Sequence, residues 1–276
     1  MIGVEGGHSI QNSIAVLRQF HALGVRYMTL SHNFTTDWVD AATDEPRHGG
    51  LSSFGEQVVR EMNRLGMFVD ISHVSAEAMR DVLEITRAPV IFSHSSALAI
   101  NSYPRNVPDD VLARMAANGG VVMVNFYAGF VPPSGPAWRS SEDSVRAYHR
   151  RVLPREAAER EVARWAAENP RPRGTLSDLA DHIDHIRRVA GIDHVGIGAD
   201  YYDPGGPSMA EGLDDVSRYP YLFAELLRRG YADADLKKIA GWNLLRAMRQ
   251  MEERARALQR TERPSRTRFR PETGGR

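Results

Sequence analysis

The chain has 276 residues, of which 42% are hydrophobic and 25% charged, a composition typical of soluble globular proteins. No apolar run approaches the roughly 20 residues that span a bilayer. We therefore expect a soluble, cytoplasmic protein without a membrane anchor. Lys plus Arg and Asp plus Glu both number 35, which argues against nucleic acid or an anionic membrane surface as a partner. Cysteine is absent, which excludes disulfides, thiolate metal sites and a cysteine nucleophile, and leaves His, Asp and Glu as the strong metal ligands.

Short apolar runs alternate with amphipathic stretches of helical period, and this pattern is typical of βα units around a parallel sheet. Strands are predicted at residues 2–4, 27–30, 68–71, 90–92, 121–125 and 195–197. Helices are predicted at residues 13–23, 53–65, 76–86, 108–118, 176–190, 219–229 and 233–255. Ser75 is expected to cap one helix start, and Gly66 and Gly119 to follow helix ends. The predicted fold class is therefore α/β.

Two segments depart from this alternation. Residues 131–174 combine six prolines with a charged, Ala- and Arg-rich stretch, which predicts an insertion over one face that acts as a lid or as the contact surface of a homodimer. Residues 257–276 contain few apolar side chains, so they are predicted to form a disordered tail because little surface could be buried. Residues 1–256 are then predicted to form one catalytic domain.

Five polar side chains follow predicted strands at the point where each strand ends. They are Glu5, His32, His73, His94 and Asp200. The carboxyl ends of parallel strands share one face, where active sites are assembled. Each residue alone would more often be a core, capping or solvated side chain, but the same placement five times favours a common site. Imidazole and carboxylate groups are typical zinc ligands, and zinc acidifies a bound water towards a pKa of about 7.

Other histidines and glycines receive a structural interpretation. His8 is expected to fix its own turn, and His182 and His185 are placed on a charged helix face and are not expected to bind metal. The Gly-Ile-Gly segment at 196–198 lacks the spacing of a dinucleotide-binding loop, so no nucleotide cofactor is expected.

Six motifs resemble the membrane (renal) dipeptidase family of zinc peptidases, in the same order. They are IGVEGGHS at 2–9, SHVS at 72–75, FSHSS at 92–96, RNVPDD at 105–110, VNFY at 124–127 and GIGAD at 196–200. The resemblance implies a (β/α)8 TIM-type barrel of the metal-dependent hydrolase kind. It also implies a zinc-dependent dipeptidase that hydrolyses dipeptides with a metal-activated hydroxide.

The resemblance implies two zinc ions bridged by Glu5, with His73 and His94 as the remaining ligands of the second ion. Family members hold the first ion with a His-x-Asp pair on a strand well before the bridging glutamate. That pair has no place before residue 5, and six predicted strands fall short of the eight of a closed barrel. We therefore expect an incomplete barrel that lacks about two N-terminal βα units, impaired activity, and a single zinc ion in this chain.

The resemblance also implies roles toward a dipeptide substrate. His32 would polarise the scissile carbonyl, and Arg105 would hold the free carboxylate with its bidentate fork. Asp200 would contact the substrate, orient the hydroxide and carry its proton to the leaving amine.

Two alternatives stay open at this point. One is a catalytically dead metal-binding fragment. The other is a barrel amidohydrolase that acts on amides or lactones, for which Arg105 would be dispensable because such substrates carry no carboxylate.

Overall fold

The computed structural model describes residues 1–201 and 208–271, and its centre is a six-stranded parallel sheet. The strands run in chain order: β1 (Ile2–Glu5), β2 (Val25–Thr29), β3 (Phe68–Asp70), β4 (Ile91–Phe92), β5 (Val121–Val124) and β6 (Val195–Ile197). Met28 is in register with Val69, and Val122 with Val195. Within the described residues β1 and β6 are the two edges of an open sheet. The predictions of an α/β fold and of six parallel strands are confirmed.

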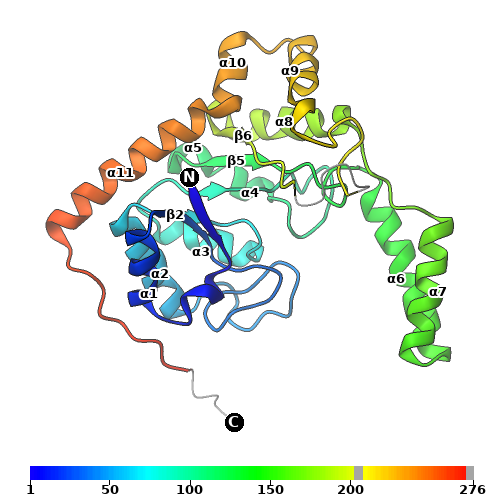
Figure 1. The fold of residues 1–276 in the computed structure, drawn as a ribbon, viewed down its shortest axis with the longest axis horizontal. Coiled ribbons are helices and arrows are strands. Elements are labelled where there is room, and N and C mark those ends of the chain that lie inside the picture. Colours follow the sequence, from blue (N-terminus) through cyan, green and yellow to red (C-terminus); the bar gives the residue numbers. More distant parts are fainter. Residues whose placement is uncertain (202–207, 272–276) are drawn as a thin grey trace.

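Helices connect the strands and cover the sheet (Figure 1). They are α1 (Ile14–Ala22), α2 (Ser53–Leu65), α3 (Ala76–Ile85), α4 (Asp109–Leu112), α5 (Met115–Asn118), α6 (Gly135–Val152), α7 (Arg155–Glu168), α8 (Leu176–Ala190), α9 (Tyr219–Arg228), α10 (Asp233–Lys237) and α11 (Asn243–Thr261). Short 3-10 turns occur at Gly7–Ile10, Ile192–His194 and Val216–Arg218. No helix in the described part of the chain has both the length and the apolar character that crossing a membrane requires.

Helix ends follow the signals in the sequence. The Ser75 side chain accepts a hydrogen bond from the backbone N–H of Ala78 at 3.2 Å, as an N-cap does. Gly66 and Gly119 end α2 and α5 with φ of 81° and 83°, a left-handed conformation that glycine adopts without steric cost.

Two predicted helices are wrong in their continuity. The helix expected over 108–118 is divided into α4 and α5, because the chain tightens where the Arg114 N–H donates to Val111 O, three residues back. The helix expected over 233–255 is interrupted by a π-helical turn, Lys238–Trp242, in which Gly241 has a non-helical backbone. Glycine has the least helical preference after proline, and the break falls on it.

The two faces of the sheet carry different partners, because side chains alternate between faces along a strand. Val69 and Val122 point to the face covered by α1, α2, α3 and α8, where the larger buried cluster lies. Phe68 and Val121 point to the opposite, inner face and pack there against Met251 of α11. Helix α11 therefore packs against the inner face near the amino ends of these strands.

The predicted disordered tail from residue 257 is corrected in its boundary. Helix α11 continues to Thr261, and the segment after it returns to α2. The Ser265 N–H donates to the Glu61 carboxylate at 3.1 Å, and the Ser265 carbonyl accepts from Arg18 at 3.0 Å. The Phe269 ring packs edge-on against Phe54 with ring centroids 5.4 Å apart. The prediction from composition was wrong here because a few specific contacts, and not the burial of a large apolar surface, hold this segment in place. Residues 272–276 lie outside the described part of the chain.

The 131–174 insertion contains a helical hairpin that stands away from the sheet (Figure 1). Helices α6 and α7 pack along one another, and the rings of Trp138 and Trp165 meet near the base with centroids 5.6 Å apart.

His182 and His185 are buried, so the prediction that they occupy a charged helix face is wrong. The charged residues of α8 lie on its other faces, whereas the His182 side chain points inward and connects two loops. Its Nδ1 accepts from the Ala97 N–H and its Nε2 donates to Val131 O, each at 2.9 Å. His185 contacts Asp109 at 2.7 Å. Both residues thus have a structural role in the described structure.

The stability of the chain is expected to fall in acid because of His182. Burial lowers the pKa of its imidazole from 6.5 to about 4, so the unfolded chain binds a proton below pH 6.5 that the folded chain does not. The free energy of unfolding therefore decreases as pH falls from 6.5 to 4, by about 3 kcal/mol for this group. Urea unfolding of wild type and His182→Gln across this range isolates the effect, since the variant should be less stable at pH 7 and show a shallower slope. Equal slopes would contradict it.

Candidate functional site

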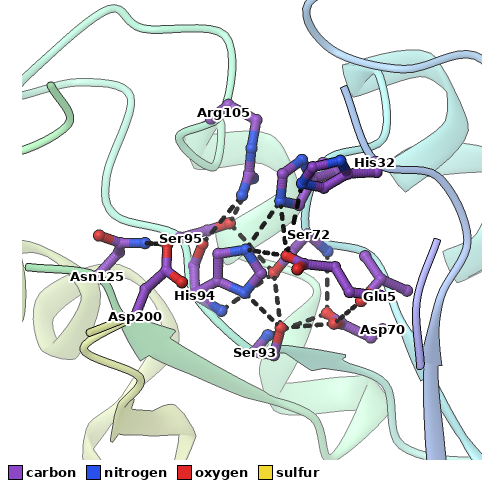
Figure 2. A network of polar contacts seen from close by, with 12 residues as sticks. Glu5, His32, Asp70, Ser72, Ser93, His94, Ser95, Arg105, Asn125 and Asp200 are labelled. Atoms are coloured by element: carbon purple, nitrogen blue, oxygen red, sulfur yellow. Dashed lines mark hydrogen bonds and ion pairs between the residues drawn. The ribbon is translucent and has the colours of Figure 1, made fainter. Parts of the chain in front are cut away.

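Four of the predicted side chains meet at the carboxyl ends of the first four strands (Figure 2). Glu5 Oε1 lies 3.1 Å from His73 Nε2 and 3.2 Å from His94 Nε2, and the two imidazole nitrogens are 2.9 Å apart. His32 Nε2 is further away, 4.0 Å from Glu5 Oε1. The alternation of strand and helix predicted this meeting, because parallel strands deliver their following residues to one edge.

Two of the site residues have an uncommon backbone. His73 has φ of 69° and Asp200 has φ of 61°, both in the left-handed region that non-glycine residues seldom occupy. Such strain persists only where the surrounding structure imposes it, and it is concentrated at functional sites. In this chain it turns both side chains into the pocket at the strand ends.

The orientation of His94 is fixed by two residues that sequence reasoning missed, Asp70 and Ser93 (Figure 2). The Ser93 hydroxyl donates to Asp70 Oδ2 at 2.5 Å, so its oxygen accepts from His94 Nδ1 at 2.7 Å. Asp70 also accepts from the hydroxyl of Thr29 and from the N–H of Ser93, and it is fully buried. A carboxylate inside an otherwise apolar strand was the available signal. This chain of hydrogen bonds leaves the lone pair of His94 Nε2 facing Glu5.

The charges around that lone pair suit a cation. Contacts with the imidazoles of His73, and then of His94, hold the pKa of Glu5 far below its usual range, so it is a carboxylate. Burial lowers the pKa of His73 to about 4, so its imidazole is neutral and carries one proton. A single proton can serve only one of the two contacts that His73 Nε2 makes with Glu5 and His94. In the described residues the buried Nδ1 of His73 has no partner. A divalent ion held by Glu5 Oε1 and by the Nε2 atoms of His73 and His94 would accept these three converging electron pairs, and the single proton of His73 would then lie on Nδ1.

His32 is an alternative to His94 as the third metal ligand. Donor atoms of Glu5, His32 and His73 lie within 4.8 Å of one another and form a possible metal site. The shorter distances from His94 to both Glu5 and His73 make His94 the better third ligand. His32 is also more open, with 42% of its side chain exposed, which leaves it free to meet a substrate.

Arg105 is a buried cation without a carboxylate partner. It is 2% exposed, and within residues 1–201 and 208–271 no acidic side chain lies within ion-pair distance of it. Its guanidinium makes long contacts with Ser95 Oγ at 3.4 Å and with His94 O at 3.5 Å. Burial lowers the pKa of Arg105 to about 10, which still leaves it charged at neutral pH. A buried, unpaired guanidinium is costly unless an anion binds to it.

Asp200 is placed by its neighbours in the sheet. The Asn125 side chain donates to Asp200 Oδ2 at 3.2 Å, and Asn125 is fully buried at the end of β5 (Figure 2). Two residues earlier, Gly198 lies so close to the Ser93 carbonyl that a Cβ there would overlap it. The absence of a side chain at Gly198 therefore allows the chain after β6 to bring Asp200 to the site.

A pocket of about 510 Å³ joins these residues. Its lining contains Glu5, His32, His73, Arg105 and Asp200, together with Asn33, Thr43, Tyr103, Tyr127 and Phe130. A larger cavity of about 890 Å³ includes Pro89, Gly119 and His194, which precede strands, and it contains none of the predicted site residues. Of these two cavities, the chemistry of the side chains favours the smaller, which combines metal-type donors with a cation that has no ion-pair partner in the described part of the chain.

Comparison with known proteins places the chain in a family. The model of the membrane dipeptidase family, peptidase family M19, matches residues 1–262. The chain belongs to this family. The family expected from the six motifs is thereby confirmed, and membership of this metallopeptidase family implies a metal.

Relatives and solved structures agree with this membership. The dipeptidase tcpJ of Claviceps purpurea (strain 20.1) is 42% identical over 254 residues, which are 92% of this chain and 51% of the relative. The structure of the probable dipeptidase PvdM from Pseudomonas aeruginosa superimposes with a TM-score of 0.80 at 30% identity, over 91% of this chain and 68% of that one. An amidohydrolase from Pseudomonas aeruginosa gives a TM-score of 0.70 at 25% identity, over 90% and 71%. The chain thus spans about half the length of the curated relative.

Proposed function

We propose that this chain is the catalytic part of a zinc-dependent dipeptidase. The observation that carries the proposal is one pocket that holds both a carboxylate-imidazole cluster and the buried Arg105, which has no ion-pair partner among the described residues. The cluster suits a metal-dependent hydrolysis, and the guanidinium suits the free carboxylate of a short peptide. The family and the dipeptidase tcpJ support the same reaction.

Glu5, His73 and His94 would hold the zinc ion. When bound, zinc supplies an acidified water and a Lewis acid for the scissile carbonyl. Ser93 donates to Asp70 and accepts from His94 Nδ1, and this chain of hydrogen bonds keeps His94 Nε2 deprotonated and aimed at the site.

The remaining residues would bind the substrate and move a proton. Arg105 would hold the carboxylate of the dipeptide, and the exposed imidazole of His32 would stabilise the oxyanion that forms at the carbonyl. Asn125 binds one oxygen of Asp200, which leaves the other oxygen to accept a proton from the attacking water. Asp200 would deliver that proton to the leaving nitrogen as the C–N bond breaks and the C–O bond remains.

Metal content and turnover of the purified chain test the proposal together. Chelated protein supplied with zinc should bind about one ion per chain, since the described donors converge on one position, and should hydrolyse simple dipeptides. Elemental analysis and a ninhydrin assay of the released amino acids measure the two properties. Zinc without hydrolysis would leave a metal-binding fragment as the function, and neither zinc nor hydrolysis would overturn the proposal. Two ions per chain would show that a second set of ligands exists.

A second candidate function is hydrolysis of cyclic amides or lactones, which the similarity to the solved amidohydrolase favours. Such substrates have no free carboxylate, so their turnover would not depend on Arg105. Parallel assays of a dipeptide and a cyclic amide separate the two candidates.

A further inference from the structure

Residues at the base of the α6–α7 hairpin contact the loops that line the substrate pocket. We propose that this hairpin holds the aromatic wall of the pocket in place through Arg139 and Arg171, which act as positioning residues for substrate binding. The inference rests on the proposed function for its substrate, whereas the contacts that carry it are independent of the reaction.

The aromatic wall consists of Tyr103, Tyr127 and Phe130, which all line the pocket. Tyr103 stacks on Phe130 with centroids 5.1 Å apart, and Tyr127 meets the same ring edge-on at 5.0 Å. The guanidinium of Arg105 lies 5.3 Å from the centre of the Phe130 ring. The wall therefore supports the residue proposed to bind the carboxylate.

Arg139 on α6 anchors the loop that carries Tyr103 and Arg105. Its Nη2 donates to the Asn101 side chain at 2.9 Å, and its guanidinium lies 4.7 Å from the centre of the Tyr103 ring. Asn101 is fully buried, and its carbonyl accepts from the N–H of Tyr103 at 2.7 Å and from the Asn106 side chain at 2.8 Å. Arg139 also donates to the carbonyl of residue 129 at 3.2 Å, so it joins both loops of the wall.

Arg171, just after α7, holds the other end of the wall. Its Nη1 donates to the hydroxyl of Tyr127 at 3.0 Å, and its guanidinium lies 4.9 Å from the centre of the Trp138 ring. Trp138 is fixed in turn by Trp165 and by donation from its Nε1 to Asn169 O at 2.8 Å. Arg171 thus connects the packed base of the hairpin to a pocket side chain.

These contacts matter because the wall lies on loops without regular secondary structure. Ordering such loops costs conformational entropy, and binding geometry is sensitive to small displacements of the groups that hold the substrate. Neither arginine contacts Glu5, His73, His94 or Asp200 in the described residues. Loss of either arginine should consequently weaken substrate binding and leave the chemical step unchanged.

Steady-state kinetics with an alanyl dipeptide test the proposal in the zinc-loaded full chain. Arg139→Ala and Arg171→Ala should each raise KM by about tenfold while kcat stays within about twofold, the signature of lost binding. Arg171→Lys keeps a donor for Tyr127 and should restore most of the wild-type KM. Arg150→Ala is the matched control, since Arg150 lies on the same hairpin and, among the residues that the structure describes, pairs only with Glu159, at 2.7 Å.

Hydrogen exchange followed by mass spectrometry gives a second readout that needs no activity. Peptides covering residues 101–107 and 127–132 should exchange faster in Arg139→Ala than in wild type or Arg150→Ala. Unchanged exchange in these peptides, or an equal rise of KM in Arg150→Ala, would overturn the proposal. If the wild-type chain hydrolyses no dipeptide, the proposed function fails and the exchange result alone decides this inference.

Discussion

Replacing His73 by alanine is expected to abolish dipeptide hydrolysis. His73 Nε2 lies within 3.1 Å of both Glu5 Oε1 and His94 Nε2, so its loss removes one of three converging donors. The fall in kcat/KM should exceed about 100-fold, the upper loss usual for residues that merely orient metal ligands. The zinc content of the same variant should fall in parallel, which elemental analysis measures.

A second substitution separates loss of chemistry from loss of folding. His73→Asn removes the imidazole but suits the backbone φ of 69°, which asparagine tolerates better than alanine. It should melt close to wild type and still be inactive. His21→Ala serves as the control, because His21 lies on α1, near Arg26 and Arg64 and outside the pocket. Normal turnover by either His73 variant would refute the proposed site.

Replacing Arg105 by alanine is expected to raise KM for dipeptides by about a hundredfold, which corresponds to about 3 kcal/mol. The reason is that the carboxylate of the substrate would lose its charged partner in a buried position. Steady-state assays should show the change mainly in KM. Arg105→Lys keeps the charge but lacks the planar fork, so its KM should lie between the two.

A dipeptide amide provides the control for Arg105, because it has no free carboxylate. Wild type and Arg105→Ala should handle the amide with similar KM if the guanidinium binds that group. An equal penalty on both substrates would instead mean that Arg105 supports the fold of the loop and does not bind the free carboxylate of the substrate.

The sequence alone predicted the sheet and the residues that follow its strands. The alternation of short apolar runs with amphipathic stretches predicts parallel strands in chain order. The residues that follow parallel strands lie together at the carboxyl edge of the sheet. Glu5, His73 and His94 therefore meet as expected. Helix continuity was less predictable, since the breaks within 108–118 and at Gly241 depend on local turns that a hydrophobic period does not reveal.

Residues whose role depends on a partner from another strand were missed. Asp70 carried a signal, as a carboxylate in an otherwise apolar strand, but that signal did not name its partner, and Ser93 is one of several serines around His94. Their hydrogen bonds to one another and to His94 exist only because β3 and β4 lie side by side. His182 was misplaced for the same reason, because its partners Ala97 and Val131 are distant in the chain.

Local pattern thus determined which side chains reach the carboxyl edge of the sheet, because the period of a strand and the direction of a βα unit are properties of short segments. Only the tertiary structure decided the proton positions around His94, the packing of α11 on the inner face and the contacts of Arg139 and Arg171 with the pocket wall. Each of these depends on groups that are far apart in sequence and become neighbours only when the core forms.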